Sequence, residues 1–187
     1  MKRREQPIVR LAAGWVQPVS TRAGHIESRG RSLVAVIMDN LVIKVAKFSL
    51  DFPVIQHIRY LVFQIEQGVS ADLEFDGNDE TADHLLAYLD GQPVGTTRIR
   101  KLDSQTAKVE RVAVIKAARG FGVGKRLMIE ALAFLQNAKV LEVKIHAQEA
   151  VRDFYQRLGF EPEGEIFVEA GIPHVKMKKL LMSQTGR

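Results

Sequence analysis

Apolar residues recur along the first patterned part of the chain with two different periods. Residues 41–47 alternate in the manner of a short strand. Asp51 then offers an N-cap for a helix. Apolar residues follow it at spacings of three and four: Val54, Ile55, Ile58, Leu61, Val62 and Ile65. The pattern predicts a strand followed by an amphipathic helix.

An acidic stretch and a hairpin pattern come next. Residues 72–83 are rich in Asp and Glu, which indicates a solvated loop with weak helical character. Strand patterns follow at 84–89 and 94–100, and Asp90 and Gly91 between them are typical of a tight turn. We therefore expect a β-hairpin here.

The second half of the chain predicts a β-α-β unit. A strand is expected at 108–114, and the helix after it carries Leu127, Met128, Ala131, Leu132 and Leu135 on one face. The next strand has the clearest alternation, with Leu141, Val143, Ile145 and Ala147 between Glu142, Lys144 and His146. A helix at 149–158 should stop at Gly159, and strands are expected around 165–168 and 174–177. The whole is a mixed α/β domain.

Residues 1–37 show no sustained period and mix Arg with Pro and Gly. They hold seven of the 27 Lys and Arg residues and two of the 22 Asp and Glu residues, which leaves a neutral body at 38–187. We expect a basic extension at 1–37 and one domain at 38–187. The extension is interpreted as a mobile tail, an organelle transit segment or a stretch upstream of a start at Met38.

Composition excludes several classes of protein. The chain of 187 residues contains no cysteine, so disulfides, thiolate nucleophiles and cysteine metal sites are excluded, and we expect no metal. The longest apolar stretch, 33–38, is too short to cross a bilayer. Because the body is neutral, a nucleic-acid groove is not indicated. A cytoplasmic protein is the default, with organelle import left open by the Arg-rich extension.

A glycine-rich turn between the strand at 108–114 and the following helix carries the first chemical signal. Gly120, Gly122 and Gly124 let the backbone approach a ligand closely, and the N–H groups at a helix start bind phosphate oxygens. A Walker A loop would need Gly at Arg119 and Ser or Thr at Arg126, and a dinucleotide fingerprint would need Gly at Lys125. Both fail, which leaves another phosphate loop or a plain glycine turn.

Two motifs in series resemble the GNAT acyltransferases. The first is Arg-x-x-Gly-x-Gly, met by Arg119, Gly122 and Gly124, and the second is Phe-Tyr, three residues, then Gly-Phe, at 154–160. The resemblance implies the GNAT fold: a mixed, mostly antiparallel sheet with a central parallel splayed strand pair, flanked by helices. It covers about residues 38–179.

Further residues are similar to the small bacterial GNATs of the ElaA and YjcF type. These residues are Arg59, Phe63, Glu66 and Gln67 on the first helix, the pair Ala147 and Gln148, and Gly-Ile-Pro-His at 171–174.

The resemblance also implies a co-substrate, acetyl-CoA, and the residues that bind it. The backbone of Val112, Ala113 and Val114 is expected to pair with the pantetheine arm. The pyrophosphate is expected on Arg119, Gly120, Phe121, Gly122, Val123, Gly124 and Lys125. Gln148 is expected either to touch the CoA arm or to cap the following helix.

Two residues are candidates for proton transfer. Tyr155 could protonate the departing thiolate, since thiol and phenol pKa values of about 8.5 and 10 are close. Its alternative is an aromatic cluster with Phe154 and Phe160. Glu110 could take a proton from the amine, and its alternative is a cross-strand ion pair with Arg98 or Arg111. Other candidates for the acceptor side are His174, Glu66 and His84.

The function expected is transfer of an acetyl group from acetyl-CoA to a small-molecule or peptide amine, by direct attack in a ternary complex. No nucleic-acid or membrane partner is expected, and a homodimer is left open. A non-catalytic acyl-CoA binder or sensor on the same fold is the first rival. Nucleic-acid binding through the Arg-rich extension and acyl-homoserine-lactone synthesis are weaker rivals.

Overall fold

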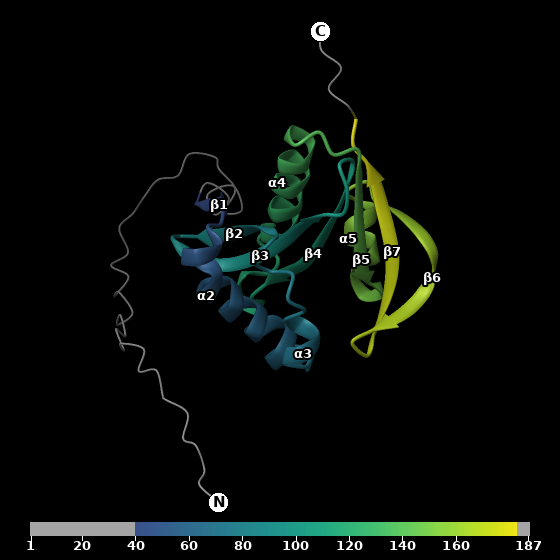
Figure 1. Cartoon of the computed structure of the whole chain (residues 1–187). Coiled ribbons are helices and arrows are strands. Elements are labelled where there is room, and N and C mark those ends of the chain that lie inside the picture. The colour runs from purple at the N-terminus through teal and green to yellow at the C-terminus, as the bar shows by residue number, and fades with distance from the viewer. Residues whose placement is uncertain (1–39, 183–187) are drawn as a thin grey trace, which may run out of the picture. The chain divides into compact units, whose positions relative to one another are not determined.

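A computed structural model describes residues 40–182 (Figure 1). The extension at 1–37 and the domain boundary at Met38 lie outside the described residues and stay predictions.

One seven-stranded sheet runs through the described chain in the order β1-β2-β3-β4-β5-β7-β6. Every neighbouring pair is antiparallel except β4 and β5, which are parallel. The strands are β1 (Leu41–Val45), β2 (Asp83–Leu89), β3 (Gln92–Lys101), β4 (Thr106–Val114), β5 (Glu142–Gln148), β6 (Glu161–Glu169) and β7 (Ile172–Leu180). The predicted mixed sheet around one parallel pair is confirmed.

Helices cover both faces of this sheet (Figure 1). On β2, Leu85 packs into the core under α4, and its neighbour Leu86 packs into a second core with Ile55 and Ile58 of α2. The two cores therefore lie on opposite faces, as the two-residue period of a strand requires. The helical elements are α2 (Phe48–Arg59), the π-helix η1 (Tyr60–Glu66), α3 (Ala71–Glu74), the short 3₁₀ turns η2 (Lys116–Ala118) and η3 (Glu149–Val151), α4 (Val123–Asn137) and α5 (Arg152–Gln156). None of these helices combines the length and apolar character that a membrane crossing needs.

The first helix starts earlier than its sequence pattern predicts. It begins at Phe48, so Asp51 lies inside the first turn and is not the N-cap. The Asp51 carboxylate instead accepts a hydrogen bond of 2.7 Å from the N–H of Lys47. An acidic residue stabilises a helix start from either place, because it faces the positive end of the helix dipole.

The predicted turn residues adopt the conformations that their types favour. Asp90 and Gly91 have φ values of 51° and 77°, as a two-residue turn between β2 and β3 requires. Gly159, with φ of 82°, follows α5, and the N–H of Phe160 donates to the carbonyl of Tyr155. The hairpin is confirmed. The helix predicted at 149–158 is shorter than expected, because η3 occupies 149–151 and α5 ends at Gln156, and the chain then turns through Gly159.

Candidate functional site

The parallel strands β4 and β5 separate after a short paired stretch. Lys108 and Lys144 are the last residues joined in their register within residues 40–182. Beyond them β4 stays paired with β3 up to Val114, and β5 stays paired with β7 up to Gln148. The inner edges of both strands therefore face a gap, and the predicted splayed pair is present. Main-chain N–H and C=O groups at such an edge are available to pair with an extended ligand.

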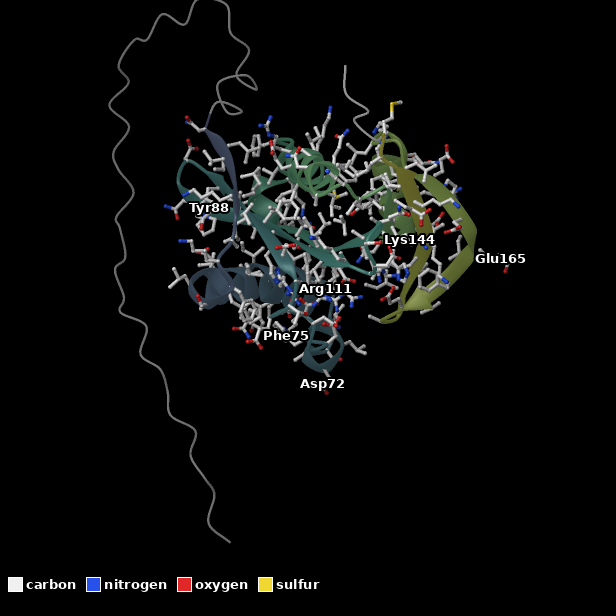
Figure 2. All side chains as sticks on the ribbon, turned by 45° about the horizontal axis from the view of Figure 1, so that its top comes forward. Asp72, Phe75, Tyr88, Arg111, Lys144 and Glu165 are labelled. Atoms are coloured by element: carbon white, nitrogen blue, oxygen red, sulfur yellow. The ribbon has the colours of Figure 1, made fainter. Side chains whose placement is uncertain are left out.

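A bulge in β4 accounts for this separation. Two residues of β4, Arg111 and Val112, lie opposite the single residue Thr97 of β3, and Arg111 has a φ of 54°. An extra residue of this kind bends the strand and increases its twist. The Arg111 guanidinium is held by the Glu74 carboxylate at 2.7 Å, on the side of the sheet that also carries Phe75 (Figure 2).

The glycine loop, residues 119–125, follows β4 and the short turn η2 and leads into the start of α4. Gly120 and Gly122 have φ values of 84° and 77°, and Gly122 is the N-cap of α4. A Cβ atom added at Gly120 would meet no atom within 4 Å, so the space beside the loop is open. The N–H groups of the first helical turn lack helical partners and attract anions. Loop and gap together thus fit an extended ligand that carries phosphate at one end.

Gly124 faces inward. A Cβ atom at this position would lie 3.8 Å from the Phe154 ring and 3.8 Å from Val114. The two sequence motifs therefore meet here, because Phe154 of the second motif packs beside a glycine of the first. The Cβ direction of Gly124 points toward the protein interior, so its main-chain N–H is the group that can contact a ligand in the loop.

The end of η1 holds both sides of the gap. Glu66 binds the Arg119 guanidinium through both oxygens, at 2.5 and 2.7 Å, while Arg119 Nε donates to the Val114 carbonyl at 3.0 Å. The next residue, Gln67, accepts a hydrogen bond of 2.9 Å from Gln148 at the end of β5. The hydrogen bond from Arg119 lowers the pKa of Glu66 from its ordinary value. Glu66, considered as an acceptor-side group, is thus paired with the loop.

Tyr155 is buried in an aromatic cluster on the α4 side of the sheet. Its ring meets Phe154 edge-on at 4.9 Å and Phe160 at 6.0 Å, and 8% of the residue is exposed. Burial raises the pKa of Tyr155 to about 12, so the phenol stays protonated at any working pH. The aromatic cluster exists, and it leaves the hydroxyl in the form that can donate a proton.

Glu110 is surrounded by cations. Its carboxylate lies 3.0 Å from Arg98 Nη2 and 3.3 Å from Lys108 Nζ, and it accepts a hydrogen bond from Arg100 Nε. Burial opposes its ionisation, but the three cations outweigh burial and hold the pKa of Glu110 below its ordinary value. The ion pair with Arg98 forms, and that with Arg111 does not, because Arg111 turns to Glu74. A catalytic role for Glu110 stays a prediction.

The acidic stretch at 72–83 is not the solvated loop that its composition indicates. Glu74 and Asp79 are 2% and 6% exposed, and they face the fully buried guanidinium groups of Arg59 and Arg98. Two buried cations need counter-charges, because an unpaired charge in the interior costs several kcal/mol. The expectation was therefore wrong for these two residues, although Asp72 is exposed (Figure 2).

An open cavity of about 620 Å³ lies against the β6–β7 hairpin. Its wall contains His146 of β5, residues 163–169 of β6 and Lys176 of β7. His146 Nδ1 lies 2.7 Å from Glu169 Oε2, and the His146 ring meets Phe167 edge-on at 5.0 Å. Sequence reasoning assigned His146 only to the polar side of β5 and did not name Glu169. The alternation of β5 was a signal for His146, whereas nothing along the chain connects it with Glu169.

The two histidines that the sequence offers for the acceptor side, His84 and His174, lie in different settings. His84 is 2% exposed, packs against Phe48 and Phe52, and bonds the main-chain oxygen of Asp79 at 2.9 Å. His174 is half-buried on β7, with Nδ1 2.8 Å from the Ile172 carbonyl. Within residues 40–182 no three His, Asp or Glu side chains are grouped as a metal ligand set.

Comparison with known proteins gives consistent matches. The family model described as an acetyltransferase (GNAT) domain matches residues 61–181. The chain is 40% identical over 125 residues to the protein YyaT of Bacillus subtilis (strain 168), covering 65% of this chain and 84% of the relative. It is 35% identical over 127 residues to the protein ElaA of Escherichia coli (strain K12), covering 65% and 82%.

Solved structures agree with these matches. The crystal structure of E. coli ElaA has a TM-score of 0.68 at 29% identity, covering 74% of this chain and 99% of that one. A GNAT family acetyltransferase from Elizabethkingia anophelis, with acetyl-CoA bound, has a TM-score of 0.62 at 18% identity, covering 76% and 99%. The second likeness concerns the fold alone.

Proposed function

The chain belongs to the GNAT family of acetyltransferases and is an acyltransferase enzyme, and from this premise we propose that it transfers an acetyl group from acetyl-CoA to an amine. The acceptor, a small molecule or a peptide, attacks the thioester directly while both substrates are bound. An acyl-enzyme route is disfavoured because the chain has no cysteine and no Gly-x-Ser-x-Gly motif.

The gap between β4 and β5 is the observation that carries the proposal. Pairing stops after Lys108 and Lys144, while β4 runs on to Val114 and leads through the short turn η2 into the glycine loop. A pantetheine arm bears amide groups that can extend such a strand edge, so Val112 to Val114 hold the arm by their main chain. The family relative with acetyl-CoA bound has the same fold, which supports this assignment.

The glycine loop holds the pyrophosphate mainly by its backbone. Gly120, Phe121, Gly122, Val123 and Gly124 supply N–H groups at the positive end of α4. The Lys125 side chain adds a full charge in the first turn of α4. Arg119 contributes less directly than the sequence suggests, because its guanidinium is already bound to Glu66 and the Val114 carbonyl. We assign Arg119 the task of fixing the loop against η1.

Gln148 and Tyr155 approach the reacting end from different elements. The Gln148 side chain, at the end of β5, donates a hydrogen bond to Gln67. When substrate is bound, the Gln148 amide can donate to a substrate amide instead. Tyr155 donates a proton to the leaving sulfur. For Glu110 the surrounding cations favour the structural role, because they stabilise the anion and make it a weak base.

Replacement of Gly122 by valine should abolish measurable binding of acetyl-CoA. The residue has a φ of 77°, and a β-branched side chain there is strained and crowds the loop that must approach the phosphates. The matched control is Gly91→Val in the β2–β3 turn, which has the same φ of 77° and no atom within 4 Å of the Cβ position.

Both variants are expected to lose about 1–3 kcal/mol of folding free energy from backbone strain. Only the Gly122 variant should lose affinity for acetyl-CoA in titration calorimetry. Unchanged affinity in a folded Gly122→Val protein would remove the phosphate-loop assignment. Release of free CoA with a panel of amines separates an enzyme from a non-catalytic acyl-CoA binder.

A further inference from the structure

Within residues 40–182, His146 borders both the β4–β5 gap and the hairpin cavity. It lies two residues beyond Lys144, the last residue of β5 that pairs with β4, so its main chain is at the gap. Its neighbours Ile145 and Ala147 are buried in the core that contains Tyr155. Side chains alternate along a strand, and the His146 ring therefore lies on the opposite face, in the wall of the cavity.

The hydrogen bond to Glu169 fixes the state of the ring. A carboxylate 2.7 Å from Nδ1 is an acceptor, so Nδ1 carries the proton and Nε2 keeps a free lone pair. The edge-on contact with Phe167 holds the plane of the ring. The side chains of His146 and Glu169 are 29% and 44% exposed, which leaves the pair open to the cavity.

Cations around the ring keep it neutral. Lys108 Nζ of β4 lies 3.4 Å from Nδ1, and both atoms bear protons, so Lys108 acts as a neighbouring charge. Burial, Lys108 and Lys176 outweigh the pull of Glu169 and hold the pKa of His146 below its ordinary value of 6.5. Two further lysines face this region, and each is paired: Lys144 with Glu142 and Lys178 with Glu163. The remaining charged or titratable groups here are Glu110, Glu165 and His174.

We propose that His146, oriented by Glu169, is the general base that takes the proton from the acceptor amine. The inference rests on the proposed function and places the acceptor in the hairpin cavity, whose volume suits a small molecule or a chain end. The amine nitrogen forms a bond to the acetyl carbon as the carbon–sulfur bond breaks. Nε2 of His146 takes the proton from nitrogen, and Tyr155 gives one to sulfur. The products are an N-acetyl amide and CoA, and nothing is oxidised or reduced.

The two proton-transfer groups thus lie on opposite faces of the sheet. Tyr155 lies on the α4 side and His146 on the cavity side of the same strand. A nucleophile that enters through the cavity meets the base first. The leaving sulfur departs toward the acid.

His146→Asn should lower kcat/KM for the acceptor by about 10²- to 10⁴-fold, the usual contribution of a positioned base. Asn keeps a hydrogen bond to Glu169 and removes the basic nitrogen. The KM for acetyl-CoA and the thermal midpoint should be unchanged. His57→Asn, an exposed histidine of α2, is the matched control and should behave as wild type. The assay follows CoA release from acetyl-CoA with a polyamine, an amino sugar and a peptide amine.

The acid limb of the kcat/KM profile should shift in opposite directions in two further variants. Glu169→Gln removes an anion that favours the protonated ring, so the pKa of His146 falls and the acid limb moves to lower pH. The plateau value of kcat/KM also falls, because the ring is no longer held in the Nδ1-protonated tautomer. Lys108→Met removes a cation that disfavours protonation, so the limb moves to higher pH. NMR titration of the imidazole rings should show the same two shifts for His146, with Nδ1 protonated in the wild-type protein.

Each outcome bears on a different claim. If wild type acetylates none of the amines, the proposed function and this inference fall together. If wild type is active and His146→Asn stays within threefold of it, only the inference fails. Shifts of the same sign in Glu169→Gln and Lys108→Met, or an Nε2-protonated His146 ring, would also overturn it.

Discussion

Tyr155→Phe is expected to bind acetyl-CoA as tightly as wild type and to transfer the acetyl group about a hundredfold more slowly. Phe keeps the ring contacts with Phe154 and Phe160 and removes only the hydroxyl. A general acid contributes about 10²- to 10⁴-fold. Burial raises the pKa of Tyr155 to about 12, well above that of a thiol at about 8.5, so the effect belongs at the low end of this range. A hundredfold equals about 2.7 kcal/mol of barrier.

Single-turnover rates test this expectation, because they report the chemical step apart from product release. Tyr88→Phe on β2 is the matched control, and its rate should equal that of wild type. A Tyr155→Phe rate within threefold of wild type would show that solvent protonates the thiolate. Tyr155 would then belong to the aromatic cluster alone.

Arg98→Met should lower the free energy of unfolding by about 3–5 kcal/mol, the usual cost of breaking a buried ion pair from one side. The Arg98 side chain is fully buried, and its guanidinium lies 2.9 Å from Asp79 and 3.0 Å from Glu110. Methionine fills similar space but leaves both carboxylates short of a counter-charge. Urea unfolding measures the loss. Arg126→Met, which breaks an exposed pair with Glu130, should change stability by no more than about 0.5 kcal/mol.

Arg98→Met should also lose stability less steeply than wild type as the pH falls. Hydrogen bonds from Arg98 hold the pKa of Asp76 well below its ordinary range. A carboxyl with a lowered folded pKa stabilises the fold above its unfolded pKa, about 3.9 for Asp, and loses this contribution as the pH falls. Wild type should therefore weaken below about pH 4 more than Arg98→Met does. Parallel pH curves for the two proteins would contradict this role of Arg98.

Local patterns in the sequence determine most of the elements. Asp90 and Gly91 specify their turn because both adopt positive φ readily, and Gly159 lets the chain turn after α5 for the same reason. The alternation around Val143, Ile145 and Ala147 predicts β5 to within one residue, because one face of that strand is buried throughout. Such features depend only on residues near one another in the chain.

The start of the first helix shows where local patterns mislead. Asp51 serves either as an N-cap or as a first-turn acid, and both uses leave the same apolar spacing behind them. The sequence therefore predicts the helix and misplaces its start by one turn. The π-helical form of η1 has no signal in that spacing either.

Contacts across long sequence distances were decided by the tertiary structure alone. Glu74 and Asp79 lie in a stretch whose composition indicates solvent, and they are buried because Arg59 and Arg98 face them from α2 and β3. Glu66 reaches Arg119 only because η1 ends over the gap.

The pairing of the candidate base, His146, with Glu169 was likewise decided by the tertiary structure. His146 is on the polar side of β5 by alternation, and Glu169 is 23 residues away on β6. They meet only because β7 pairs with both strands and so brings β6 near β5. By itself the sequence thus determined the elements, their order and the glycine loop, whose conformations depend on near neighbours. Burial of charge and the pairing of His146 with Glu169 came from the packing of distant strands, which local propensities do not encode.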